Sequence, residues 1–327
     1  MSIELFFDSI KSDHTKRCYD YYLKKYGHDK LTVRDPKTAE SEIIEFILQM
    51  KKEGKSFYAI SNYVTALISF FKINDIMLNP KRITRFLPER RRMRKDRSYT
   101  YEEIGKMLEI ADERMRAVIL ILSSSGIRVG ALPSIKVGNL ENNGLTVYES
   151  FREEYLTFVT PECKKAIDNY LDMRLRYGEK LTGDSVLIRE QFDIRDPFQI
   201  KKPKQISRDA IQWMLNDIAR RSGVRSPDVP IAHGFRKFFT TQLIHNKVNS
   251  EIREMLLGHN IGLASAYYRP TRDEMFSEYE KAIDALTINE ENRLKKKIET
   301  LTIEKSRLDI LEAKYQQLEQ RTRRSRN

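Results

Sequence analysis

The sequence predicts a mainly α-helical protein with a small β-hairpin sheet, divided into two domains and followed by a C-terminal helical tail. Over most of the 327 residues, apolar side chains recur at the three- and four-residue spacing of amphipathic helices. Residues 137–160 are the exception, because they have the β-branched and aromatic composition of strands. A strongly basic run separates two helical regions, which places the domain boundary at residues 89–98.

Residues 1–88 form the first predicted domain, a compact module of four helices. The first helix begins near Leu5, and Ser12 can cap the second, whose aromatic stripe ends at Gly27. The third and fourth helical patterns cover residues 41–52 and 58–72. We expect the aromatic side chains of this module to pack in its core, since large apolar side chains are mostly buried in folded proteins.

The run from Lys81 to Arg97, KRITRFLPERRRMRKDR, holds nine basic residues. Such a run is often only a solvated linker. Its place between two predicted domains favours a second interpretation, in which the run crosses the phosphate backbone of DNA and displaces counterions. On this interpretation the linker, residues 89–98, supplies the DNA-binding side chains Arg90, Arg91, Arg92, Arg94 and Lys95.

Residues 99–286 form the second predicted domain. A helix begins at Tyr99, and another, from Arg114 to Ser124, leads to Arg128. The β-favouring residues that follow predict a ribbon of two or three strands, with a turn before Gly144. Further helices are expected at residues 161–178, 207–221 and 275–286. The polar loop after the first of these supplies three more expected DNA contacts, Lys201, Lys202 and Lys204.

A segment near the end of this domain carries the strongest candidate site. His233 and Arg236 lie one helical turn apart, so a helix sets both on one outward face. On the opposite face, Phe235, Phe239 and Leu243 recur at the spacing of buried residues. A buried scaffold is therefore expected to present a basic pair.

A second histidine and a tyrosine follow in the same segment. Gly258 suits the position that ends a short helix, and it fixes His259 immediately afterwards. Tyr268 comes nine residues later and has a second tyrosine, Tyr267, beside it. A phenol that is accompanied by His and Arg side chains has the potential for phosphate-transfer chemistry.

Four short motifs thus occur in a fixed order, namely GIR at 126–128, HGFR at 233–236, LGH at 257–259 and Tyr268. In this order and spacing the chain resembles the tyrosine recombinases, the phage-type integrases and Xer-like resolvases, and among them the divergent archaeal integrases. The resemblance covers nearly the whole chain. It implies the two-domain DNA clamp of the DNA breaking-rejoining enzymes, with a core-binding domain (1–88) and a catalytic domain (99–286).

The resemblance also implies a function and a mechanism. The protein would be a site-specific recombinase, an integrase of a mobile element or virus, in which Tyr268 attacks the scissile phosphate to form a 3′-phosphotyrosyl intermediate. Arg128 and Arg236 would bind non-bridging phosphate oxygens. His233 would act in general acid–base catalysis, and His259 would hydrogen-bond a phosphate oxygen. No metal ion or high-energy cofactor is implied, because the covalent link retains the bond energy.

Two residues depart from the family pattern. The family usually has an acidic residue three positions after the first arginine, where this chain has Ala131. It also places a lysine in the β-hairpin to protonate the leaving 5′-hydroxyl, yet no lysine occurs between Lys136 and Lys164. Arg152 is the only hairpin cation, and its high pKa makes an arginine a poor proton donor. The general acid is therefore unassigned.

Composition indicates the partner and the compartment. The chain has 59 Lys and Arg against 47 Asp and Glu, a net charge of +12, which favours double-stranded DNA as partner. No apolar run reaches the roughly 20 residues of a membrane span, and the N-terminus does not resemble a signal peptide. We expect a cytoplasmic, nucleoid-associated protein. Cys18 and Cys163 have no companions that would indicate a disulfide framework or a zinc site.

Two other functions remain open at this stage. A type IB topoisomerase shares the catalytic logic and relaxes supercoils without pairing two sites. A catalytically inactive DNA-binding protein of the same fold would use the basic surface alone. Trapping of a covalent protein–DNA adduct separates the active enzymes from the inactive binder.

The tail, residues 287–327, lacks Gly and Pro and is dense in charge, which predicts a long helix. Its apolar residues fit one heptad seam and then a shifted one. One interpretation is an amphipathic helix packed on its own catalytic domain. The other is a coiled coil between protomers, which suits a homotetramer on paired sites. The seam residues are Leu294, Ile298, Leu301 and Leu308, then Leu311, Tyr315 and Leu318.

Overall fold

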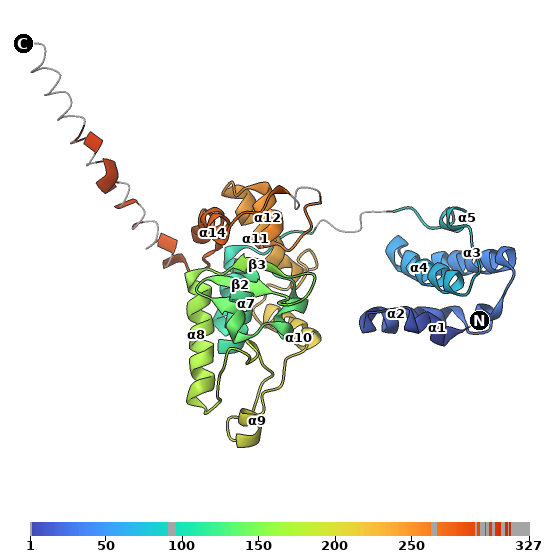
Figure 1. Ribbon diagram of the computed structural model, residues 1–327, viewed down its shortest axis with the longest axis horizontal. Coiled ribbons are helices and arrows are strands. Elements are labelled where there is room, and N and C mark those ends of the chain that lie inside the picture. The colour runs from blue at the N-terminus through green and yellow to red at the C-terminus, as the bar shows by residue number, and fades with distance from the viewer. Residues whose placement is uncertain are drawn as a thin grey trace, which may run out of the picture. The chain divides into compact units, whose positions relative to one another are not determined.

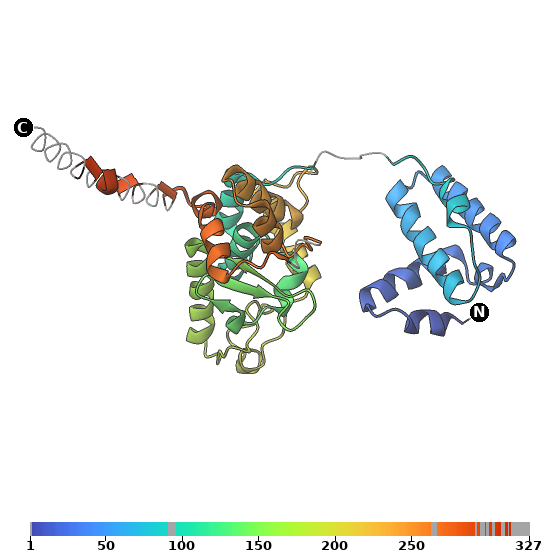
Figure 2. The same cartoon turned by 45° about the horizontal axis from the view of Figure 1, so that its top comes forward.

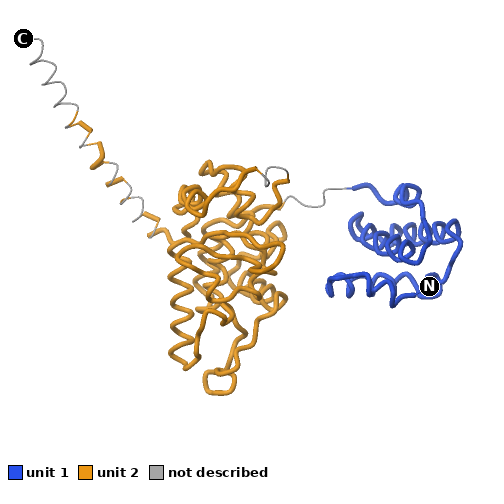
Figure 3. Tube along the Cα trace, viewed as in Figure 1, with its two compact units in different colours: residues 1–94 blue, residues 95–327 orange. Residues whose placement is uncertain are grey.

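The computed structural model describes residues 2–90, 96–262 and 267–291, and residues 293–294, 298, 301–302, 305–308, 311–312 and 314 of the tail. The chain divides into two compact units, Met1–Arg94 and Lys95–Asn327 (Figure 3). Each unit has a hydrophobic core of its own. Over the described residues the structure is mainly helical, with a small antiparallel sheet in the second unit (Figures 1 and 2). This confirms the predicted fold class.

Unit 1 is a helical module. Phe6 and Phe70 meet edge to face in its core, with ring centroids 5.4 Å apart. The third helix begins before residue 41, where the apolar pattern starts, because Asp35 caps it and Pro36 fits its first turn. The elements are α1 (Ile3–Asp8), α2 (Asp13–Tyr26), η1 (Lys30–Thr32), α3 (Pro36–Lys52), α4 (Phe57–Ile73) and α5 (Pro80–Thr84).

Unit 2 is built around α7 (Glu113–Ser125), which packs against α8 and α11. The last turn of α7 consists of buried serines, and the hydroxyls of Ser124 and Ser125 each donate a 2.6 Å hydrogen bond to a carbonyl four residues earlier. These bonds satisfy polar groups inside the core. The other helices are α6 (Tyr101–Ile110), α8 (Pro161–Arg176), α9 (Pro197–Lys201), α10 (Arg208–Arg221), α11 (His233–His245), α12 (Ser250–Leu256), α14 (Arg272–Glu280) and α15 (Ile283–Leu286).

The helix predicted over residues 275–286 is two helices, α14 and α15. Helix α14 ends at Glu280 and α15 begins at Ile283, with Ala282 between them at a φ of −106° and a ψ of −2°. The break lets Tyr279 of α14 and Leu286 of α15 both reach full burial. Tyr279 also donates a 2.9 Å hydrogen bond to the carbonyl of Ser124 at the end of α7.

The sheet packs on the end of α7. Its strands run antiparallel in the order β1 (Leu140–Glu141), β2 (Gly144–Val147) and β3 (Tyr155–Phe158). Thr157 of β3 donates a 3.2 Å hydrogen bond to the carbonyl of Ser125. The loop between β2 and β3, residues 148–154, is thereby held beside the end of α7.

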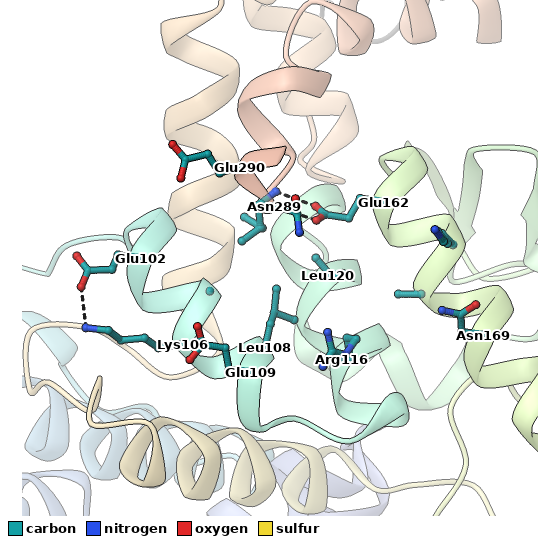
Figure 4. A pocket seen from close by; sticks show the side chains of 14 residues that line it. Glu102, Lys106, Leu108, Glu109, Arg116, Leu120, Glu162, Asn169, Asn289 and Glu290 are labelled. Carbon is teal, nitrogen blue, oxygen red and sulfur yellow. Dashed lines mark hydrogen bonds and ion pairs between the residues drawn. The ribbon is translucent and has the colours of Figure 1, made fainter. Parts of the chain in front are cut away.

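The base of the tail is fixed to unit 2. The carboxylate of Glu162, at the start of α8, accepts hydrogen bonds from the backbone N–H groups of Ile288 (2.7 Å) and Asn289 (2.9 Å) (Figure 4). Tyr101 donates a 2.6 Å hydrogen bond to the carbonyl of Ala285, and the Arg293 guanidinium lies over the Tyr101 ring. The tail therefore begins at a defined position, beside a pocket of about 560 Å³ between α6, α7 and α8.

Farther along the tail, the described residues are helical. The described seam side chains are 52–63% exposed, so they do not pack on the core of the second unit. Tyr315 and Leu318, and the terminal RTRRSR sequence, lie outside the described residues. The seam side chains with these exposures are Leu294, Ile298, Leu301, Leu308 and Leu311.

Candidate active site

The GIR motif forms the turn that ends α7. Gly126 has a φ of +63°, and a Cβ at this position would lie 2.2 Å from Cδ1 of Phe239, so the turn requires glycine. The chain then enters the 3₁₀ helix η2 (Val129–Ser134), with the exposed Arg128 at its start. Ala131, where the family usually has an acidic residue, is fully buried.

Helix α11 carries the HGFR motif. Phe235, Phe239 and Leu243 are fully buried, as predicted, and His233 at the first position of the helix is exposed. The predicted outward direction of Arg236 is wrong, because this residue is only 6% exposed. Its guanidinium turns inward, where backbone carbonyls act as its hydrogen-bond acceptors.

Arg236 connects the GIR and LGH turns. Its Nη1 donates a 2.7 Å hydrogen bond to the carbonyl of Gly126, and its Nη2 donates one of the same length to the carbonyl of Leu257. Nη2 also lies 2.7 Å from Nε2 of His259. Burial, and then the nearby charge of Arg128, lower the pKa of Arg236 from its usual value. An arginine still stays charged under these conditions, so two cations remain side by side.

The LGH motif forms the turn after α12. Gly258 has a φ of +64°, and a Cβ there would lie 2.4 Å from Cε1 of Tyr155. His259 follows, and its Nδ1 lies 2.6 Å from Oε2 of Glu254 in the preceding helix. This hydrogen bond is the main cause of a lowered pKa for Glu254, which is therefore ionised near neutral pH. The motifs do not include Glu254, although its place near the end of α12 could have suggested a contact with His259.

Tyr155 of β3 is a second residue that the motifs missed. Its hydroxyl oxygen is buried and forms no hydrogen bond of regular geometry with the described residues, although it lies close enough to Arg236 and Arg128 to feel their charges. Burial raises the pKa of this phenol, whereas the two arginines oppose the increase. The ring packs on Gly258 and so supports the LGH turn from the side of the sheet.

A cavity of about 620 Å³ opens beside this cluster. Arg128 from η2, Gly258 from the LGH turn and Phe151 from the β2–β3 loop are among its lining residues. The exposed guanidinium of Arg128 thus borders a space that could receive a phosphate group. All of the lining segments belong to unit 2.

His233 is electrostatically linked to the same cluster. Partial burial of the imidazole is the largest cause that lowers the pKa of His233, followed by the charges of Lys237 and Arg236, with a smaller contribution from Arg128. Asp96 opposes this shift, and its carboxylate lies 3.2 Å from Nζ of Lys237. A neutral imidazole near neutral pH can accept a proton, as a general base must.

The structure brings together Arg128, His233, Arg236 and His259, but it does not show Tyr268 bonded to them. Tyr268 is 38% exposed and Tyr267 is 90% exposed. The described residues provide no hydrogen bond between Tyr268 and the other four side chains. Residues 263–266, which precede the two tyrosines, lie outside the described part of the chain.

The β2–β3 loop contains no lysine. Arg152 in the β2–β3 loop is exposed. The two lysines that flank the hairpin in sequence form ion pairs of their own, Lys136 with Asp184 and Lys164 with Asp168. The general acid therefore stays unassigned among the described residues.

The predicted DNA-binding side chains that the structure describes lie in both units. In unit 1, Nε of Arg90 donates a 2.8 Å hydrogen bond to the hydroxyl of Tyr58. In unit 2, helix α9 and the residues after it carry the second group, Lys201, Lys202 and Lys204. Figures 1 and 2 place α9 at the end of unit 2 opposite α11 and α12, away from the candidate site. The remaining predicted contacts, Arg91, Arg92, Arg94 and Lys95, lie outside the described residues.

Metal sites and membrane spans are both absent from the described residues. These residues contain no group of three or more His, Cys, Asp or Glu side chains that could hold a metal ion. Nor is any of their helices long and apolar enough to cross a membrane.

Comparison with known proteins identifies the family. Residues 97–274, more than half of the chain, match the model of the phage integrase family. The tyrosine recombinase XerA of Pyrococcus furiosus is 26% identical over 287 residues, which cover 83% of this chain and 89% of that protein.

Solved structures share the fold. An integrase of the Tn1549 transposon, in complex with a circular intermediate DNA, has a TM-score of 0.61 at 16% identity and covers 85% of this chain and 98% of its own. A lambda integrase dimer bound to a COC' core site has a TM-score of 0.58 at 16% identity, covering 83% and 96%. The chain therefore belongs to the phage integrase family and is a tyrosine recombinase.

Proposed function

We propose that this protein cuts and rejoins duplex DNA at specific sites, with Tyr268 as nucleophile. The observation that carries the proposal is the side chain of Arg236, which binds the GIR turn and the LGH turn at the same time. That connection holds Arg128, Arg236 and His259 within one cluster, beside a cavity lined by Arg128. Fixed cations of this kind stabilise the negative charge that develops during phosphoryl transfer.

In the proposed reaction the Tyr268 oxygen forms a bond to phosphorus, and the bond from phosphorus to the 5′-oxygen breaks. His233 accepts the phenol proton, and Arg128 and Arg236 bind the non-bridging oxygens. The leaving 5′-oxygen takes a proton from a donor that is still unassigned. Attack by another 5′-hydroxyl reverses these steps, so the strand is rejoined without an external energy source.

Duplex DNA is the proposed substrate. The net charge of +12 favours a polyanion, and the Tn1549 and lambda integrase structures were solved with DNA. We propose that unit 1 clamps one side of the duplex, and that the basic linker and the lysines beside α9 contact phosphates away from the cleavage point. Such a protein would act in the cytoplasm, in association with the nucleoid.

Four subunits on two paired sites are the proposed assembly. The exposed seam of the tail supports a coiled coil between protomers, since Leu294, Ile298 and Leu301 have no partner in the described part of their own unit. A further proposal is that the protein serves as the integrase of a mobile element of archaeal type.

A suicide substrate tests the proposed chemistry. Selection of bound sequences from a random duplex library first defines the site, and a nick beside the cleavage point then traps the covalent adduct. Wild type and Tyr267→Phe should form the adduct in the presence of EDTA, whereas Tyr268→Phe should not. Mass spectrometry of the nucleotide-bearing peptide checks the position. Binding without any adduct would point to an inactive DNA-binding protein, and an adduct on another tyrosine would overturn the assignment of Tyr268.

A further inference from the structure

Glu254, His259 and Arg236 form a continuous chain of polar contacts. Oε2 of Glu254 lies 2.6 Å from Nδ1 of His259, and Nε2 of the same imidazole lies 2.7 Å from Nη2 of Arg236. A guanidinium can only donate hydrogen bonds, so Nε2 must be the acceptor in this contact. The single proton of a neutral His259 then resides on Nδ1, from which it is donated to Glu254. The geometry thus selects one of the two imidazole tautomers.

Glu254 is itself held in place. Its second carboxylate oxygen, Oε1, lies 3.3 Å from Nε of Arg253. Its backbone carbonyl accepts a 2.9 Å hydrogen bond from the backbone N–H of His259. Main chain and side chain of Glu254 therefore both contact His259.

We propose that Glu254 is a positioning residue, which acts through His259 to hold the Arg236 guanidinium in the orientation that binds phosphate. This inference rests on the proposed function and adds Glu254 to the residues that support the proposed reaction. If the carboxylate were removed, the imidazole proton could move to Nε2, where it would face the N–H of Arg236 at 2.7 Å. The two donors would repel each other, and Arg236 would lose one of its supports.

The inference also bears on the missing acidic residue. Ala131 leaves the first arginine motif without the carboxylate that the family usually has there. Glu254 brings a carboxylate to the same cluster from a different element, α12, and reaches it through a histidine rather than through the first arginine. The acidic group is therefore supplied from outside the motif.

Nuclear magnetic resonance of the imidazoles tests the tautomer directly. The chain has five histidines, so selective ¹⁵N-histidine labelling gives few signals, and those of His259 are the ones that disappear in His259→Asn. In the neutral form of His259, wild type should show a protonated Nδ1 and an unprotonated Nε2. Glu254→Ala should shift the signals toward a mixture of tautomers. Glu254→Gln, which keeps an acceptor oxygen at the same reach, should retain the Nδ1–H form.

Adduct formation on the suicide substrate gives the second measurement. Glu254→Ala should slow it about ten- to one-hundredfold, the range for loss of a hydrogen bond to a charged group, with unchanged affinity for DNA. Glu254→Gln should recover most of the rate. The matched control is Glu251→Ala, since Glu251 is an exposed carboxylate in the same helix that bonds to Ser250 instead.

Several results would overturn the inference. These are an unchanged tautomer in Glu254→Ala, an equal loss of rate in Glu251→Ala, or a Glu254→Gln variant that keeps the tautomer but reacts as slowly as Glu254→Ala. If wild type forms no adduct, the proposed function fails, whereas the imidazole signals still decide whether Glu254 sets the tautomer. The two failures are thus distinguishable.

Discussion

The guanidinium of Arg236 and the backbone carbonyl of Gly126, 110 residues apart in sequence, are joined by a hydrogen bond of 2.7 Å. The same side chain binds the carbonyl of Leu257. One residue therefore joins two turns and also brings a positive charge beside His259. A substitution at Arg236 is expected to affect stability as well as chemistry.

Arg236→Ala should lower the free energy of unfolding by about 3 kcal/mol, because it leaves two carbonyl groups without their donor and each such loss costs about 1–3 kcal/mol. Urea denaturation followed by circular dichroism measures this change. Arg220→Ala is the control, since Arg220 is exposed on α10 and should change stability by less than about 0.5 kcal/mol. An Arg236→Ala variant as stable as wild type would show that the two turns hold their shape without it.

The lowered pKa of His233 predicts a pH dependence of stability. The unfolded chain, with a histidine pKa of 6.5, binds this proton more readily than the folded protein does. The free energy of unfolding is therefore highest above pH 6.5. It decreases as the pH falls from 6.5 through the lowered pKa of the folded state. His233→Gln should flatten the curve of unfolding free energy against pH in this window. A His233→Gln curve that keeps the wild-type slope in this window would contradict the prediction.

The basic linker predicts a salt dependence of DNA binding. Replacing Arg90, Arg91, Arg92 and Arg94 together by Ala should reduce the slope of log K against log salt, by about 0.9 for each phosphate that these side chains neutralise in the wild type. Fluorescence anisotropy over a range of salt concentrations measures the slope. An unchanged slope would show that the basic run is only a solvated linker and does not contact phosphates. The same measurement on Lys201→Ala, Lys202→Ala and Lys204→Ala combined tests the group beside α9.

We expect the tail to be needed for assembly of subunits but not for cleavage of a single DNA site. Truncation after Arg293 keeps Thr287 and Ile288, which are buried, and the contact of Arg293 with Tyr101. This variant should still form an adduct at a single site, but should show less self-association in light scattering and less recombination between two sites. Ile298→Glu combined with Leu301→Glu should do the same in the full chain. Unchanged light scattering and recombination in both variants would exclude an assembly role for the tail.

The sequence predicted local elements well and long-range contacts poorly. The spacing of Phe235, Phe239 and Leu243 predicted the buried face of α11, because helical periodicity is a local property. The same spacing put Arg236 on the outer face, since periodicity says nothing about carbonyl acceptors 110 and 21 residues away. The break between α14 and α15 carries no local signal in the sequence, because no Gly or Pro marks Ala282.

Two residues of the site, Glu254 and Tyr155, lie outside the motifs and were not predicted from the sequence. Glu254 stands five residues before His259, and the turn predicted at Gly258 says that the chain reverses but not which side chain of the preceding helix the imidazole contacts. Tyr155 looks like any aromatic residue of a β-strand. Both become recognisable only when the strand and the turn are seen side by side.

The hydrogen bonds from Ile288 and Asn289 to Glu162 have a practical consequence for protein engineering. They fix the point at which the tail begins, so the sequence after the contact of Arg293 with Tyr101 can be exchanged without disturbing the core. A dimerisation module that responds to a small molecule could be fused after Arg293 in place of the native tail. Pairing of two DNA sites could then be switched on by dose and timed independently of strand cleavage.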